Sequence, residues 1–227
     1  MNLIVDLQYF PSSILYKSLS EFSNIVFDQY ENYQKMSFRN RCRIAGADGP
    51  INLSIPLVHG RDQKAIMKDV KISDRQPWQA QHWKTIVSCY SRSPWFEFYR
   101  DELEMMYKKR FDFLLDWNRV CFEWSLRTLG LSIPVTLTDG YRKVYAAGEG
   151  VDWRGKIVPK DGAAAAAKEE GEGRLSAATA SSDMGVSSGT VLKYHQVFGE
   201  RTGFIPNLSI LDLLCCEGKE AIRYIRS

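Results

Sequence analysis

A short polar loop directly after the first apolar segment is where the sequence first places residues that can do chemistry. Residues 3–7 read Leu-Ile-Val-Asp-Leu, which predicts a strand, and Gln8, Tyr9 and Pro11 follow it. Ligands of an open parallel sheet bind outside the carboxyl ends of its strands, so Gln8 and Tyr9 are candidate binding residues. The helix expected after Pro11 adds free N–H groups that attract anions. A plain strand exit with a structural proline remains the alternative.

Three arginines form a second candidate group. Arg39, Arg41 and Arg43 alternate along a segment that predicts a strand, so they share one face. Guanidinium groups in this arrangement can hold a phosphate or carboxylate through paired hydrogen bonds. A solvated strand face is the simpler explanation of Arg39 and Arg43. Asn40 lies on the opposite, apolar face, where a buried amide must find hydrogen-bond partners.

The residue type best matched to general-base catalysis is histidine, because its pKa lies near neutral pH, and His82 is the candidate. His82 shares a helical stripe with Trp78 and Ile86, so a hydrogen-bonded core histidine is the competing interpretation. Tyr33 and Lys35 follow the second predicted strand and border the same expected cleft. Exposed loop residues are the alternative for both.

Other patterns narrow the chemistry. The 3 histidines and 5 cysteines do not follow the spacing of metal ligands, so no metal site is expected. No GxxxxGK[ST], GxGxxG or GxSxG motif is present, and no cofactor is indicated. Most of the tryptophans between residues 78 and 124 have helical spacing and are expected in the core, although such a density can also supply sugar-stacking platforms. Asp212 is interpreted as the N3 capping partner of Ser209.

A mixed α/β fold must position these residues. The predicted elements, in chain order, are a β-loop-α-β opening over 3–28, a β-hairpin over 36–57 with a five-residue loop at 46–50, a strand at 66–72, three helices within 76–129, of which the last runs from Phe111 to Leu129, and a strand at 133–137. The two opening strands are joined through a helix, which favours a parallel pair. The predicted class is therefore α/β with a mixed sheet and a helical subdomain.

Composition divides the chain into three parts. Residues 1–145 are expected to form the main α/β domain, with its helical part at 76–129. Residues 146–189 are more than half Ala, Gly and Ser, which predicts a flexible insertion, because such a segment buries too little apolar surface. Residues 190–227 are expected to complete the same domain with a strand near 191–195 and helices after Pro206.

The overall charge and hydropathy exclude several classes of protein. Of 227 residues, 30 are Lys or Arg and 27 are Asp or Glu, so the net charge is +3, and 44% are hydrophobic. This suits one globular domain and lacks the basic character of proteins that bind duplex nucleic acid. No uncharged apolar run is long enough to span a membrane, and no signal peptide is recognised. A cytoplasmic protein with reduced thiols is expected.

Several separated short motifs occur in a recognisable order. They include Gln8-Tyr9-Phe10-Pro11, Asn40-Arg41, the stretch from Trp78 to His82, and the late segment from Phe204 to Leu214. Together they resemble the WbqC-like family over residues 3–139 and 191–222. The family is associated with bacterial surface-polysaccharide (O-antigen) gene clusters. The resemblance implies a context of sugar or cell-envelope biosynthesis. Within it we interpret the chain as a transferase of surface-polysaccharide biosynthesis that attaches an amino acid such as glycine, or an acyl unit, to a sugar.

This interpretation gives the candidate residues roles. Arg41 and Lys35 would hold an anionic sugar or sugar-nucleotide substrate, and His82 would remove a proton from the attacking amine or hydroxyl. Gln8, Tyr9 and Asn40 would orient the reacting groups, and Tyr33 would border the cleft. The family's His-Gln-Pro triplet is absent, because Leu7-Gln8 runs directly into Tyr9, so the role of that histidine does not transfer. The alternative is a non-catalytic module of a cell-envelope pathway that binds a sugar or a protein.

Overall fold

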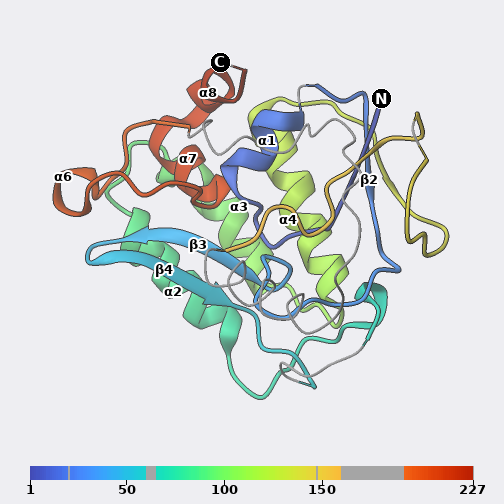
Figure 1. Cartoon of the computed structure of the whole chain (residues 1–227). Coiled ribbons are helices and arrows are strands. Elements are labelled where there is room, and N and C mark those ends of the chain that lie inside the picture. Colours follow the sequence, from blue (N-terminus) through green and yellow to red (C-terminus); the bar gives the residue numbers. More distant parts are fainter. Residues whose placement is uncertain (20, 60–64, 147, 160–191, 227) are drawn as a thin grey trace, which may run out of the picture.

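The computed structural model describes residues 1–19, 21–59, 65–146, 148–159 and 192–226 (Figure 1). The strands and helices, in chain order, are β1 (Asn2–Val5), α1 (Ser13–Leu19), β2 (Asn24–Phe27), β3 (Arg41–Gly46), β4 (Gly49–Ser54), η1 (Met67–Asp69), α2 (Trp78–Tyr90), α3 (Phe96–Lys108), α4 (Leu114–Leu129), β5 (Val135–Leu137), β6 (Val151–Asp152), α6 (Gly199–Thr202), α7 (Ile210–Glu217), η2 (Gly218–Glu220) and α8 (Ala221–Arg226). The expected α/β class is confirmed: a parallel sheet, a separate hairpin and several helices are present.

The main sheet has the strand order β5-β2-β1-β6, and each neighbouring pair is parallel. All four strands therefore end at the same edge. Residues on one face of the sheet, such as Val5 and Phe27, belong to the hydrophobic core. The ring of Phe27 meets that of Phe122 on α4 edge-on at 4.9 Å between centroids. Figure 1 shows α1 and α4 on one side of β2, so helices cover this face.

The C-terminal helices pack against the N-terminal segment of the chain. Ser12 and Ser209 form an isolated antiparallel bridge, and the Ser13 N–H donates to the Leu208 carbonyl at 2.9 Å. Helices α7 and α8 pack against α1, as Figure 1 shows. The start of α1, expected from the sequence to attract an anion, is thus used to hold the C-terminal segment.

The hairpin was expected to have a five-residue loop, and this expectation is wrong. Gly46 pairs with Gly49, so only Ala47 and Asp48 form the turn. Gly49 has a φ of 124°, which a residue with a Cβ adopts only under strain, and this conformation allows the tight turn. The hairpin also forms its own two-stranded sheet, because β3 and β4 pair only with each other among the described strands.

The prediction of a strand at residues 66–72 is also wrong. Residues 67–69 form the 3-10 turn η1, and pairing at Ile66, Lys71 and Ile72 is limited to isolated bridges. Met67 and Val70 are both fully buried, whereas Asp69 between them is exposed. A spacing of three between buried residues fits one helical turn better than the alternation of a strand.

The three helices expected between 76 and 129 are confirmed as α2, α3 and α4. The third begins at Leu114 instead of Phe111, because the preceding Phe113 has extended backbone angles, with φ −112° and ψ 140°. It ends, as expected, at Gly130, which adopts the left-handed conformation. No described helix combines the length and apolar character needed to cross a membrane.

Part of the predicted insertion belongs to the sheet. Strand β6 pairs with β1 through Leu3 and Val151, and the Trp153 N–H donates to the Ile4 carbonyl at 2.7 Å. The predicted boundary at residue 146 is therefore corrected: residues 148–159 add an edge strand and the buried indole of Trp153. Residues 160–189 of the predicted insertion lie outside the described residues. The strand expected near 191–195 is not formed by 192–195.

Candidate functional site

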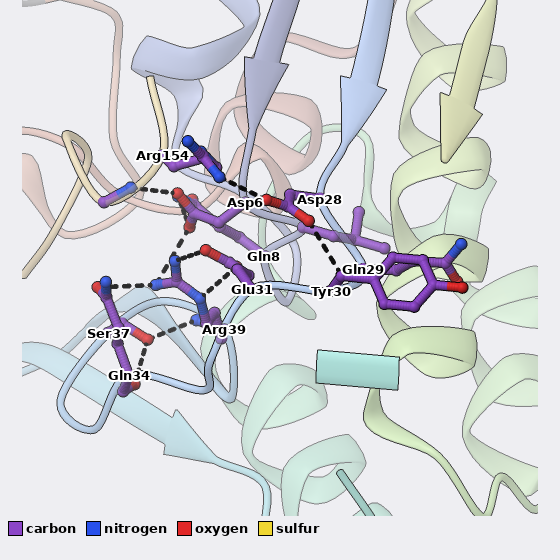
Figure 2. A network of polar contacts seen from close by, with 12 residues as sticks. Asp6, Gln8, Asp28, Gln29, Tyr30, Glu31, Gln34, Ser37, Arg39 and Arg154 are labelled. Atoms are coloured by element: carbon purple, nitrogen blue, oxygen red, sulfur yellow. Dashed lines mark hydrogen bonds and ion pairs between the residues drawn. The ribbon is translucent and has the colours of Figure 1, made fainter. Parts of the chain in front are cut away.

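A buried network of charged side chains lies at the carboxyl ends of the parallel strands. Asp6 directly follows β1, Asp28 directly follows β2, and Arg154 follows β6 by two residues. Figure 2 shows the strand arrowheads pointing toward this network, with Glu31 and Arg39 at its centre. The sheet thus gathers charges from distant parts of the sequence at one edge, where open parallel sheets place their ligands.

Arg39 joins the network through a two-point ion pair. Its Nε and Nη2 each donate to one carboxylate oxygen of Glu31 at 2.7 Å, and its Nη1 lies 3.6 Å from Asp6 Oδ2. The Arg39 side chain is 0% exposed. The solvated face expected for Arg39 is therefore wrong, because β3 begins only at Arg41 and strand alternation does not reach Arg39.

Arg154 connects three strand ends. Its Nη1 donates to Asp28 Oδ2 at 2.6 Å, and its Nε and Nη2 donate to Asp152. Asp28 Oδ1 accepts a hydrogen bond from Thr138 Oγ1 at 3.1 Å, which brings in the end of β5. The ring of Tyr145 lies under the Arg154 guanidinium at 5.1 Å from its centroid, close enough for a cation–π contact.

Burial dominates the electrostatics of the network. It raises the pKa of Glu31 to about 7, because the loss of solvation outweighs the pairing with Arg39. Burial lowers the pKa of Arg39, but Asp6 and Glu31 outweigh it and raise that pKa above its ordinary value. Hydrogen bonding to Asp152 and Asp28 raises the pKa of Arg154, so both guanidinium groups stay charged.

Gln8 is part of this network, as a polar group in the loop after β1. Its Nε2 donates to Asp6 Oδ2 at 3.0 Å and to the Ile157 carbonyl at 3.3 Å. Its Oε1 is buried and accepts no hydrogen bond from the described residues. Asn118 on α4 fixes the surrounding loops, because its Nδ2 donates to the Leu7 and Arg39 carbonyls at 3.1 and 2.7 Å.

Tyr9 and His82 lie together in the aromatic core. Tyr9 Oη is 3.1 Å from His82 Nδ1 and 2.5 Å from Tyr107 Oη. His82 is 6% exposed, and its ring meets the ring of Trp78 edge-on. Burial lowers the pKa of His82 to about 4, which outweighs a hydrogen bond with the Ser54 backbone. His82 is therefore neutral at pH 7 and has the surroundings of a core histidine.

Tyr33, Asn40 and Arg41 form a third group, near the start of β3. Tyr33 Oη donates to Asn40 Oδ1 at 2.9 Å, and Asn40 Nδ2 donates to the Ile55 carbonyl at 3.0 Å. Burial raises the pKa of Tyr33, and the charges of Arg41 and Arg39 partly offset this rise. Arg41 is half-buried, and Lys35 lies exposed in the turn before Met36. The seven residues predicted from the sequence thus fall into three groups: Gln8 in the charged network, Tyr9 with His82 in the aromatic core, and the remaining four near the start of β3.

A cavity of about 550 Å³ adjoins the network on the face of the sheet opposite the helices. Side chains alternate along a strand, and the neighbours of Ile4 and Val26 face the core, so Ile4 and Val26 point to the opposite face. Both line the cavity together with Asn2. The remaining lining comes from the end of β5 and the segment after it, and includes Thr138, Asp139, Gly140, Arg142, Tyr145 and Glu149. Its volume lies in the usual range for small-molecule sites, about 300–1,000 Å³.

The cavity and the network share residues at their boundary. Thr138 lines the cavity and donates to Asp28, and Tyr145 lines it and stacks under Arg154. Arg142 pairs with Glu149 at 3.3 Å on the cavity wall. Asp139 is exposed there and forms no ion pair or hydrogen bond with the described residues. None of the seven candidate residues from the sequence, Gln8 and Tyr9 included, lines this cavity.

Asp212 has a different role from the one expected. Ser209 is the N-cap of α7 and accepts from the Leu211 N–H, but the Asp212 carboxylate accepts hydrogen bonds from Tyr90 Oη and Tyr194 Oη, each at 2.7 Å. The interpretation of Asp212 as the capping partner of Ser209 is wrong. The buried carboxylate instead joins α2 and the 192–198 segment to α7, and burial raises its pKa.

Most residues of the network were not predicted from the sequence, namely Asp6, Asp28, Glu31 and Arg154. A signal was available for two of them, because Asp6 and Asp28 stand at the ends of the two strands that were predicted. Glu31 and Arg154 carried no comparable signal. Arg154 lies in the segment expected to be an insertion, and Glu31 reaches the network only through Arg39.

Searches of curated proteins and of solved structures found no match. A family model, described as the WbqC-like protein family, matches residues 8–224, which include most of the network and of the cavity wall. The chain therefore belongs to the WbqC-like family.

Proposed function

We propose that this protein is a transferase of surface-polysaccharide biosynthesis that attaches an amino acid, such as glycine, or an acyl unit to a nucleotide-linked sugar. Membership of the WbqC-like family supports this class of function. The observation that carries it is the 550 Å³ cavity at the sheet, which adjoins the charged network and combines a cation, a carboxylate, a hydroxyl and an aromatic ring in its lining.

In this proposal the sugar nucleotide occupies the cavity. Arg142 holds the diphosphate, because a guanidinium pairs with phosphate oxygens through two hydrogen bonds, and the ligand replaces Glu149 as its partner. The ring of Tyr145 packs against the base or the sugar. The network behind it, from Asp28 to Arg154, fixes Thr138 and Tyr145 in place.

The reaction needs an acceptor for one proton. The amine or hydroxyl of the sugar attacks the carbonyl carbon of an activated acyl or aminoacyl donor, the new C–N or C–O bond forms, and the leaving group departs. Asp139 takes the proton of the attacking group in our proposal, since it is an exposed carboxylate on the cavity wall. His82, buried and neutral, supports the loop that carries Tyr9.

The test combines binding and turnover. Purified full-length protein is incubated with UDP- and dTDP-linked amino sugars and with glycine plus ATP or an acyl thioester, and products are followed by mass spectrometry. Arg142→Gln is expected to weaken sugar-nucleotide binding about tenfold or more, the scale of a lost charged hydrogen bond. Asp139→Asn is expected to lower turnover about a hundredfold or more with binding retained. Lys143→Gln, next to Arg142 but outside the cavity lining, is the matched control.

The alternative is a non-catalytic sugar-binding module. The pairing of both buried arginines with carboxylates favours it, because a structural ion-pair network needs no reaction to explain it. Saturable binding that depends on Arg142, with no product from any donor, would support this alternative. Equal behaviour of the Arg142 and Lys143 variants would reject the cavity as the site.

A further inference from the structure

A second cavity, of about 420 Å³, lies between the start of α2 and the end of α3. Trp83 from α2 is half-buried and supplies the accessible aromatic surface, whereas Trp78 and Tyr107, which also line the cavity, are each 4% exposed. The close spacing of these tryptophans in the sequence indicates possible sugar-stacking residues, and the proposed function assigns them no role. None of the lining residues of this cavity lines the 550 Å³ cavity, so the two are separate.

Planar polar groups surround the aromatic side chains. Asp74, Gln76, Gln79 and Glu104 all line the cavity. Arg110 pairs with Oδ2 of Asp74 and also with Asp112, and Lys108 lies 3.0 Å from Glu104 Oε1. The second carboxylate oxygens of Asp74 and Glu104 lie outside these pairs. Gln79 Nε2 donates to the Lys109 carbonyl at 2.7 Å, which orients its amide group. Carboxylates and amides of this kind can each exchange two hydrogen bonds with neighbouring hydroxyl groups.

The charges of the lining select the class of ligand. Asp74 and Glu104 bring two negative charges, and Lys108 and Arg110, each paired with one of them, bring two positive charges, so the charges at this cavity balance. A neutral polyol suits such a lining, because its hydroxyl groups donate to the carboxylates while its C–H faces contact the aromatic lining. We propose that this cavity binds neutral sugar residues of a glycan chain. Only the source of that glycan rests on the proposed function; the site itself rests on its lining.

The supporting helices make the site rigid. The Trp83 ring lies 5.9 Å from the Tyr107 ring and 6.0 Å from the Phe96 ring, and Trp78 packs edge-on against Trp117 at 5.4 Å. These contacts fix the aromatic side chains before any ligand arrives, which lowers the entropic cost of binding. The site would hold part of a glycan while the reaction takes place at the separate cavity on the sheet.

The experiment titrates the full-length protein with chitobiose, maltose and cellobiose and follows tryptophan fluorescence and saturation-transfer NMR. At least one disaccharide is expected to bind saturably in the millimolar range. Gln79→Ala is expected to raise the Kd about three- to tenfold, the loss of one or two hydrogen bonds. Gln81→Ala is the matched control, because Gln81 lies exposed on the same helix but outside the cavity. Trp83→Leu is expected to abolish binding, and the Gln79 variant decides the outcome if Trp83→Leu does not fold.

The outcomes separate this inference from the proposed function. No saturable binding of any of the three disaccharides, or equal Kd values for the Gln79 and Gln81 variants, would overturn the glycan site. UDP-sugar binding that depends on Arg142 would leave the proposed function standing in that case. Conversely, disaccharide binding that depends on Gln79 stands even if Arg142→Gln leaves sugar-nucleotide binding unchanged.

Discussion

Arg39 and Glu31 form a two-point ion pair inside the protein, with both donor–acceptor distances at 2.7 Å and side-chain exposures of 0% and 6%. The pair stands between the loop after β1 and the segment that leads into β3, with Asp6 as its third member. A buried pair contributes little net stability compared with apolar residues, but removing one partner leaves an uncompensated charge. We therefore expect substitution of one partner of the Arg39–Glu31 pair alone to destabilise the fold.

Arg39→Ala is expected to destabilise the fold by about 3–5 kcal/mol, because Asp6 would remain buried without its cation and Glu31, whose pKa burial already raises, would have to bind a proton. Arg43→Ala on β3 is the control, since that side chain is half-buried and its Nε has no partner among the described residues, and it should cost about 1 kcal/mol or less. Urea unfolding followed by circular dichroism measures both. Similar losses for the two variants would contradict a special role for Arg39.

A double substitution refines this prediction. Arg39→Met combined with Glu31→Gln removes both charges of the pair, so the combined loss should be smaller than the sum of the two single losses by about 1–3 kcal/mol. Strict additivity would show that the two side chains do not stabilise each other.

Asp28→Asn is expected to loosen β6, because the carboxylate of Asp28 is the partner of Arg154 at the end of that strand. Hydrogen exchange should show faster exchange of the Trp153 N–H, which donates to the Ile4 carbonyl, while the β1–β2 pairing keeps its protection. Arg223→Gln, in an exposed pair with Glu220, is the control and should change neither. Unchanged exchange at Trp153 would mean that the Asp28–Arg154 pair does not hold β6.

Gly150 precedes β6 and sits against β1 with no room for a side chain. An added Cβ would collide with Ile4 Cδ1 and lie 2.8 Å from the Asn2 carbonyl oxygen. Gly150→Ala is therefore expected to cost about 1–3 kcal/mol and to expose Trp153 to solvent, visible as a red shift of its fluorescence. Gly140→Ala should be nearly neutral, because nothing lies within 4 Å of its Cβ position. Equal stabilities of the two variants would argue against close packing at Gly150.

The sequence was sufficient to predict the elements whose pattern is local. The opening strands, the helices α2, α3 and α4, and the stop at Gly130 follow from periodicity and glycine placement. It was not sufficient for β6, a strand of only two residues whose stability comes from pairing with β1 and from Arg154. Short edge strands carry almost no sequence signal, since tertiary contacts and not propensity select them.

The candidate site was predictable only in part for the same reason. Gln8 was found because it follows a strand, and the structure places it at the charged network. Arg39 was misassigned, because the partner that makes it a buried ion is eight residues away in a loop. The cavity depends on the segment from Asp139 to Glu149, which has no regular pattern. Pairings between loops of this kind are fixed by the whole fold.

His82 has a core and a catalytic interpretation, and the two differ in what a substitution removes. His82→Gln removes a ring that contacts Tyr9 Oη, Trp78 and the Ser54 backbone, so a loss of about 1–3 kcal/mol in unfolding free energy is expected. Turnover per folded molecule should remain nearly unchanged. A normally folded variant with turnover about a hundredfold lower would instead restore His82 as the base.

The pH dependence gives an independent readout. The pKa of His82 falls from 6.5 to about 4 on folding, because burial favours the neutral ring. At His82 the unfolded chain therefore binds more protons between these values, and the contribution of His82 is fully present above pH 6.5 and is lost as the pH falls toward 4. The loss amounts to about 3 kcal/mol at most. Stability of His82→Gln should vary less over this window, whereas Tyr107→Phe, which removes only the neighbouring hydroxyl, should keep the wild-type slope. Parallel curves for all three proteins would show that His82 is not buried as a neutral ring.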